Sequence, residues 1–113
     1  TDFYVRLCDV DAKGRSFNLA DGIVRIGPDH PRTKDGGLEL HIELFPTANT
    51  FAKGHRIRLQ VSSGAHPLYV RNLGTGDPLG KGTEMVAADQ EVFHDPARPS
   101  AILLPVLAEP VRA

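Results

Sequence analysis

Asp9, Asp11 and Gly14 have the residue types and the spacing of a calcium-binding loop, D-x-D-x-[DN]-G. Such a loop also needs an oxygen ligand at its fifth position and a bidentate glutamate at its twelfth. Here those positions hold Lys13, which is a cation, and Ala20, which has no side-chain oxygen. The residues before the loop favour a strand, whereas an EF-hand requires a helix. We therefore interpret this stretch as a turn after a strand and expect no metal site.

Ser62, in the sequence QVSSG, comes nearest to a hydrolase nucleophile. The G-x-S-x-G elbow needs a glycine where Gln60 stands and a following helix, which Pro67 would interrupt. His94 and Asp95 suggest a histidine–carboxylate pair, but adjacent strand residues point to opposite faces. We expect a strand end at Ser62 and a turn at 94–96, and no catalytic residue in either place.

Other chemical motifs are incomplete. GKGT at 80–83 has Gly82 where a P-loop needs serine or threonine, and no helix pattern follows it. The five histidines form no closely spaced ligand pair. We expect neither a metal nor a cofactor to be bound.

Composition narrows the function classes. Lys and Arg total 13 against 14 Asp and Glu, so the chain lacks the positive field that nucleic acids or anionic membranes attract. No apolar run is long enough to span a bilayer, and we expect a cytoplasmic location. The single cysteine, Cys8, cannot form an internal disulfide, and we expect it to be a small buried hydrophobe in a strand.

Period-two alternation predicts short strands and almost no helix. The clearest case is LELHIELF, which places four aliphatic residues on one face and Glu39, His41 and Glu43 on the other. A single helical turn could form at 17–22, with Asn18 as its cap. The strands are expected at 3–10, 22–26, 38–45, 55–62, 85–94 and 100–107. Ile57, Leu59 and Val61 should face inward, and the glycine- and proline-rich stretches 27–37 and 73–83 should be loops. This pattern is typical of an all-β sandwich or barrel.

Four blocks, taken together, carry a family resemblance. They are TDFYVRLCDVDAKGRSFNLADGIVRI, LFPTANTFAKGHRIRLQVSS, HPLYVRNLGTG and HDPARPSAILLPV. In this order and with these spacings the chain resembles the C-terminal domain of the X-Pro dipeptidyl-peptidase and cocaine esterase-like (CocE/NonD) hydrolases. It departs from the family's usual pattern at His66 and Val70, and its 27–37 loop is shorter.

The resemblance implies an antiparallel jelly-roll sandwich of galactose-binding-like type. Residues 1–113 would be the later part of that domain, without its first strands. The partner would be an α/β-hydrolase domain of the same parent chain, which carries the catalytic triad. The β-domain would pack on that domain and help to shape its active-site cleft. No position of the triad maps onto this chain, so this chain alone is not expected to hydrolyse esters or X-Pro amides.

Two further expectations concern contacts. Arg71 and Asn72 are polar residues at a strand end beside a glycine-rich loop; they are our candidates for a domain-interface contact, and a solvent-exposed turn is the alternative. Exposed strand edges could also pair with a second copy of the chain. A different function, a free-standing carbohydrate- or ligand-binding jelly roll, would require exposed aromatic side chains, and this sequence has no tryptophan.

Overall fold

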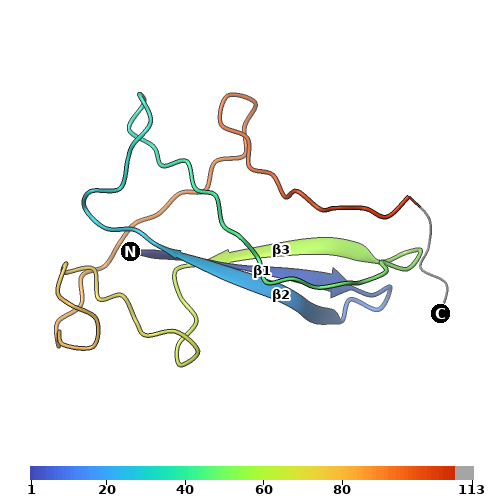
Figure 1. Cartoon of the computed structure of the whole chain (residues 1–113), viewed down its shortest axis with the longest axis horizontal. Helices are drawn as coiled ribbons and strands as arrows, with labels where there is room; N and C mark the ends of the chain where they lie inside the picture. The colour runs from blue at the N-terminus through green and yellow to red at the C-terminus, as the bar shows by residue number, and fades with distance from the viewer. Residues whose placement is uncertain (109–113) are drawn as a thin grey trace.

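Three antiparallel strands form one sheet in the order β2-β1-β3, with β1 in the centre (Figure 1). They are β1 (Asp2–Val10), β2 (Ser16–Arg25) and β3 (Arg56–Ser62). The computed structural model describes residues 1–108, and within these residues no helix is found and hence none that could cross a membrane. The expected all-β class is confirmed.

The central strand β1 carries most of the core. Five of its residues are buried: Tyr4, Val5, Leu7, Cys8 and Val10. The neighbouring strands cover both edges of β1, so other side chains need to cover only its two faces. Cys8 is completely buried, as expected for a small hydrophobe in a strand.

The ladder between β1 and β2 contains an irregularity between Leu7 and Cys8. Leu7 pairs with Ala20 and Cys8 pairs with Asn18, so Leu19 is an extra residue on β2, as in a β-bulge. The predicted helical turn at 17–22 is therefore wrong. Asn18 does not cap a helix, because its backbone lies in register with the long central strand, and tertiary pairing overrides a weak local preference.

The segment 38–45 keeps the predicted alternation but does not form a strand. Leu38, Leu40, Ile42 and Leu44 are partly covered, and the polar residues between them are exposed. Its one backbone hydrogen bond to the sheet runs from the amide of Phe45 to the carbonyl of Asp21, at 3.0 Å. An extended segment becomes a strand only when a ladder pairs its backbone, and no such ladder forms here.

The strands predicted at 85–94 and 100–107 are also absent. Within the described residues the only bridge in this part of the chain joins Asp95 to Arg98. Neither stretch pairs with the sheet, and both run as irregular chain (Figure 1). The part of the chain that the structure describes thus contains one sheet, and the second layer of a jelly-roll sandwich stays a prediction.

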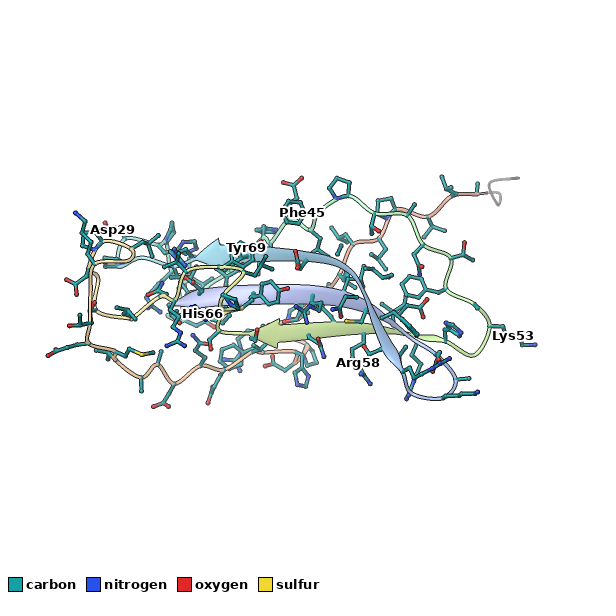
Figure 2. All side chains as sticks on the ribbon, turned by 90° about the horizontal axis from the view of Figure 1, so that it is seen from below. Asp29, Phe45, Lys53, Arg58, His66 and Tyr69 are labelled. Atoms are coloured by element: carbon teal, nitrogen blue, oxygen red, sulfur yellow. The ribbon has the colours of Figure 1, made fainter. Side chains whose placement is uncertain are left out.

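Ile57, Leu59 and Val61 lie in register with β1, where Leu59 pairs with Leu7 and Val61 with Val5. The predicted alternation is correct, but burial is incomplete, since these three residues are 51%, 40% and 42% exposed. The reason is that β3 is an edge strand with no strand beyond it. Lys53, in the turn before β3, lies near one end of the molecule, and Asp29 lies at the other (Figure 2).

Candidate functional site

The candidate calcium loop is a hydrogen-bonded turn between β1 and β2. One oxygen of Asp11, Oδ1, accepts hydrogen bonds from the backbone amides of Lys13 and Arg15, both at 2.9 Å. The other, Oδ2, accepts from Nε of Arg15 at 2.6 Å. The amide and side chain of Arg15 and the amide of Lys13 hold the pKa of Asp11 below its ordinary value. Both oxygens thus serve the turn, which confirms its interpretation as a turn.

Asp9 connects β1 to the segment that precedes β3. Its Oδ1 lies 2.8 Å from Nδ1 of His55, and its Oδ2 accepts a hydrogen bond from the side chain of Asn49 at 3.1 Å. Asp9 is itself buried, so these contacts satisfy a carboxylate that has little access to water. Asp9 therefore has a structural role at the end of the ladder.

Ser62 and Asp95, which we rejected as catalytic residues, have the structural roles that the sequence predicted. Ser62 ends β3, and its hydroxyl donates to the carbonyl of Gly64 at 3.1 Å. The carboxylate of Asp95 accepts from the amides of Ala97 and Arg98 and from the side chain of Arg98, closing the expected turn. Between residues 1 and 108, no three His, Cys, Asp or Glu residues gather in a way that could hold a metal ion.

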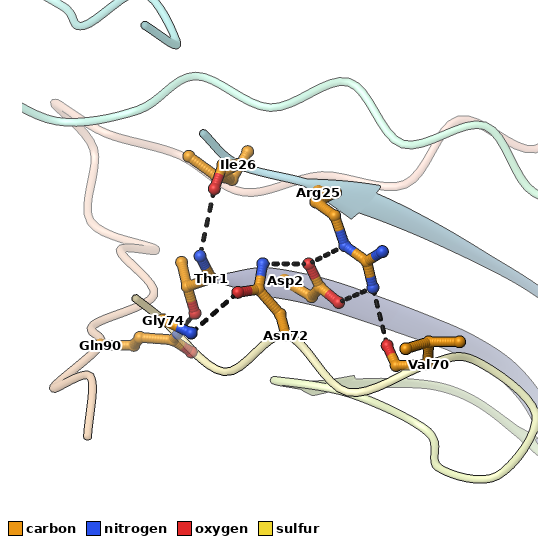
Figure 3. A network of polar contacts seen from close by, with 8 residues as sticks. All are labelled: Thr1, Asp2, Arg25, Ile26, Val70, Asn72, Gly74 and Gln90. Atoms are coloured by element: carbon orange, nitrogen blue, oxygen red, sulfur yellow. Dashed lines mark hydrogen bonds and ion pairs between the residues drawn. The ribbon is translucent and has the colours of Figure 1, made fainter. Parts of the chain in front are cut away.

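The proposed interface residues lie on a loop that is tied to the sheet by a polar network (Figure 3). The side chain of Asn72 donates to Oδ1 of Asp2 at 2.8 Å and accepts from the amide of Gly74 at 3.0 Å. The guanidinium of Arg25 binds both oxygens of Asp2, at 2.8 Å and 2.6 Å, and also donates to the carbonyl of Val70 at 2.8 Å. One network thus joins β1, β2 and the 70–74 loop.

Asp2 is the centre of this network, and its side chain is only 2% exposed. Burial by itself would raise the pKa of Asp2, but hydrogen bonds from Arg25 and Asn72 and the positive charge of Arg25 outweigh it and lower the pKa. The carboxylate is therefore held in its charged form. Because a buried charge is costly unless it is paired and hydrogen-bonded, the network favours one position of the loop.

A second contact fixes the start of the same loop. The ring of Tyr69 packs on the ring of Tyr4, with centroids 5.9 Å apart. The Tyr4 hydroxyl donates to Asp21 at 2.6 Å and accepts from the guanidinium of Arg6. Burial and the bond to Asp21 raise the pKa of Tyr4, so the phenol stays protonated as a donor.

The structure separates the two predicted interface residues. Asn72 is partly buried and binds within the domain, whereas Arg71 is exposed and has no hydrogen-bond or ion-pair partner among residues 1–108. Sequence reasoning missed Asp2 and Arg25. A charged residue at the start of a predicted strand was the only available signal for Asp2.

An open depression lies over β1 and the end of β3. Its volume is about 590 Å³, and it is lined by Tyr4, Arg6, Gln60, Val61, Ser62, Gly64 and Ala65. Among the described residues, every buried side-chain nitrogen or oxygen has a hydrogen-bond partner. The depression therefore presents no buried polar group that waits for a ligand.

Comparisons with known proteins give one family and one clear relative. Residues 1–103 match the family described as the X-Pro dipeptidyl-peptidase C-terminal non-catalytic domain. The chain is 38% identical over 115 aligned residues to a cocaine esterase of Rhodococcus sp. (strain MB1 Bresler), an alignment that covers 95% of this chain and 20% of that esterase. The chain thus spans about one-fifth of the length of this relative. No solved structure matches the chain.

Proposed function

The chain belongs to the family of X-Pro dipeptidyl-peptidase C-terminal non-catalytic domains, and from this premise we propose that it is the accessory β-domain of a longer serine hydrolase. It packs on the α/β-hydrolase domain of the same polypeptide and helps to form the wall of the active-site cleft. The reaction, hydrolysis of an ester or of an X-Pro amide, takes place on that other domain.

The small share of the relative that the chain covers supports this proposal. The chain matches only 20% of that esterase. The rest of a comparable enzyme would be long enough to contain the catalytic domain. Among the described residues, Asp11 and Asp95 bind groups of their own turns, and Asp9 binds His55 and Asn49 at the end of the ladder.

The observation that carries the proposal is the fixed loop around Arg71. The residues on either side of it are held to the sheet: Arg25 binds the carbonyl of Val70, and the Asn72 side chain binds Asp2. The Arg71 side chain between them is exposed. A side chain on a backbone that is already ordered loses less conformational freedom when it binds. Arg71 is therefore well placed to contact a neighbouring domain.

The chemistry of arginine indicates which kind of group Arg71 would contact. Its planar guanidinium can bind both oxygens of a carboxylate at once, and it stays charged at any working pH. We propose that Arg71 pairs with an aspartate or glutamate on the catalytic domain, beside the cleft. Asn72 and Asp2 then act as positioning residues that hold the loop.

The experiment uses the full-length hydrolase that contains this chain, with Arg71→Ala compared with Lys53→Ala. Lys53 is also exposed but lies toward the other end of the molecule from Tyr69 (Figure 2). We expect Arg71→Ala to weaken docking by about 2 kcal/mol, which is within the range for breaking an interdomain charge pair. In calorimetry the two domains should then unfold separately, and kcat/KM should fall.

A second measurement separates docking from folding. In the isolated 113-residue chain, Arg71→Ala should change the unfolding free energy by less than about 0.5 kcal/mol, as for a surface residue without contacts. The proposal is wrong if Arg71→Ala and Lys53→Ala leave the full-length enzyme equally cooperative and equally active.

The depression beside Tyr4 and Arg6 favours one alternative, a free-standing binding module for sugars or other small polar ligands. Arginine and glutamine side chains can bind hydroxyl groups there. A thermal-shift screen of the isolated chain against a panel of monosaccharides distinguishes the two functions. Binding that Arg6→Ala abolishes would favour the module, whereas the accessory domain predicts no shift.

A further inference from the structure

Arg6, in the middle of β1, carries a charge for which the described residues provide no carboxylate. Its guanidinium makes two hydrogen bonds, both to the Tyr4 hydroxyl, from Nε at 3.2 Å and from Nη2 at 2.9 Å. Among residues 1–108 Arg6 forms no ion pair. The residue is half-buried, and a charge that is partly removed from water is costly unless an opposite charge pairs with it. Arg6 is therefore a candidate for binding an anion.

The hydrogen bonds to Tyr4 hold the guanidinium of Arg6 in one orientation and leave most of its donors free. The Tyr4 hydroxyl occupies the N–H of Nε and one N–H of Nη2. The edge formed by Nη1 and the second N–H of Nη2 has no acceptor within the described part of the chain. Tyr4 is itself held, because its hydroxyl donates to Asp21 at 2.6 Å and its ring packs on Tyr69. The free edge of Arg6 can bind both oxygens of one carboxylate.

The side chains near Arg6 favour an anion over a neutral ligand. Gln60 is opposite Arg6 in the β1–β3 ladder, and Arg58, two residues earlier in β3, lies on the same face of the sheet. Arg58 is exposed and forms no ion pair among the described residues. Asp21 is opposite Arg6 in the β1–β2 ladder, and one of its oxygens already binds the Tyr4 hydroxyl. Two arginines beside one aspartate leave a local excess of positive charge.

The open depression over β1 and the end of β3 provides room beside Arg6 for the body of a ligand. Arg6 and Gln60 line it together with Tyr4, Val61 and Ala65, and the last three offer apolar surface. Its volume of about 590 Å³ lies within the range of about 300–1,000 Å³ that is usual for small-molecule sites. Because the depression is open, it can bury only part of a ligand, and we expect weak binding.

We propose that this depression binds a small organic acid. The carboxylate of the acid lies on the free edge of Arg6, and its apolar body lies against Tyr4, Val61 and Ala65. Gln60 is a second donor, because its side-chain nitrogen has no acceptor among residues 1–108. A neutral sugar in the same place would leave the charge of Arg6 without a partner.

The acid site is separate from the proposed contact of Arg71, because it uses one face of the sheet and not the 70–74 loop. Hydrolysis of an ester or of an X-Pro amide releases a carboxylic acid. The proposed function therefore supplies one source of such a ligand, but the site itself does not rest on that function. Loss of the Arg71 contact should leave acid binding unchanged, so the two proposals can fail independently.

A nuclear magnetic resonance titration of the 113-residue chain tests the class of ligand and its location together. The probe is phenylacetate, and phenylacetamide is the neutral control of nearly the same shape. We expect phenylacetate to shift the amide resonances of Arg6, Gln60 and Ala65 with a Kd of about 1 mM, the order of magnitude for a ligand of this size. Phenylacetamide should bind at least about tenfold more weakly, because it cannot form the charge-assisted pair.

Substitutions test whether Arg6 binds the carboxylate. Arg6→Gln should raise the Kd of phenylacetate at least about tenfold and abolish the preference for the acid over the amide. Arg58→Gln should raise the Kd only about two- to threefold, because Arg58 contributes a screened charge and no direct contact. Lys53→Gln is the matched control: it also removes one positive charge, but Lys53 lies near the end of the molecule, before the start of β3 (Figure 2). Its Kd should equal that of the unmodified chain.

Three results would overturn the proposal. They are equal binding of phenylacetate and phenylacetamide, no binding of phenylacetate up to about 20 mM, and shifted resonances that lie away from the depression. Unchanged binding in Arg6→Gln, with its fold confirmed by circular dichroism, would also contradict it. The comparison of the two ligands needs no substitution, so it decides the proposal even where Arg6→Gln lowers the stability of the chain.

Discussion

Asp2 and Arg25 are directly opposite each other in the β1–β2 ladder and form a two-point ion pair. The carboxylate is almost fully buried, whereas about one-third of the arginine side chain is exposed. The guanidinium of Arg25 also donates a hydrogen bond to the carbonyl of Val70. A cross-strand pair thus also fixes a loop that is far away in the sequence.

We expect Asp2→Asn to destabilise the chain by about 1.5–3 kcal/mol near neutral pH, the range for lost hydrogen bonds to a charged group. The folded-state pKa of Asp2 lies below its ordinary value of 3.8. Its stabilising effect is therefore fully present above the unfolded-state pKa and is lost as the pH falls through the lower folded-state value.

Urea unfolding at a series of pH values measures this effect. The gap between the unmodified chain and Asp2→Asn should be constant above about pH 5 and should shrink below the ordinary aspartate pKa. A gap of the same size at all pH values would contradict a charged Asp2 in the folded state.

Gly22→Ala should disrupt the contact between β2 and the 38–45 segment. A Cβ at this position would lie 2.2 Å from the carbonyl oxygen of Glu43 and 3.2 Å from Cγ2 of Ile42. The first of these is backbone and cannot move alone, so we expect a loss of about 1–3 kcal/mol, as for overpacking. Gly64→Ala is the matched control, because a Cβ there meets nothing within 4 Å. Equal stabilities of the two variants would show that the segment does not lie against Gly22.

Asp9→Ala should release the 46–55 connection from the end of β1. The substitution leaves His55 and Asn49 without their common acceptor, and we expect a cost of about 1–3 kcal/mol. Hydrogen exchange should speed up at the β3 amides near Arg56. Asp29→Ala, on an exposed loop, should change neither quantity. Unchanged exchange in Asp9→Ala would mean that the contacts of Asp9 do not hold β3 in place.

The thiol of Cys8 should be unreactive in the folded chain. Cys8 is completely buried, and its sulfur lies 3.5 Å from Oδ1 of Asn18. We expect labelling by a thiol reagent only through unfolding, so that the rate follows the unfolding equilibrium. Cys8→Ala should label not at all and should lose only modest stability. Rapid labelling under native conditions would contradict the central position of β1.

Period-two alternation predicted a strand in each of the three places where the structure has a paired strand. The stretches 3–10 and 55–62 almost coincide with β1 and β3, whereas 22–26 overlaps only the last part of β2. At 17–22 the pattern indicated a helical turn, and the structure extends β2 through it with Leu19 as the extra residue. A bulge depends on the register of the partner strand, and a single strand's sequence does not contain that register.

At the candidate site, too, the sequence predicted some features and only the structure shows the others. From the sequence YVRN we predicted Arg71 and Asn72 as candidates for a domain-interface contact. The structure shows that the Asn72 side chain binds Asp2 and that Arg71 is exposed. Asp2 and Arg25 could not be matched from the sequence, because 23 residues separate them and only the ladder places them opposite each other. The interface role of Arg71 stays a prediction.

The sequence by itself determined the all-β class, the alternation of apolar and polar side chains, the turn at Asp11 and the family. These properties depend on residue type and on neighbours a few positions away, which fix backbone preference and side-chain direction. Only the tertiary structure decided that 38–45 lacks a ladder, that β3 has an open edge, and that Asp2, Arg25 and Asn72 meet. Each of these depends on which distant segment supplies the hydrogen-bond partner, and that choice is made by the packing of the whole chain.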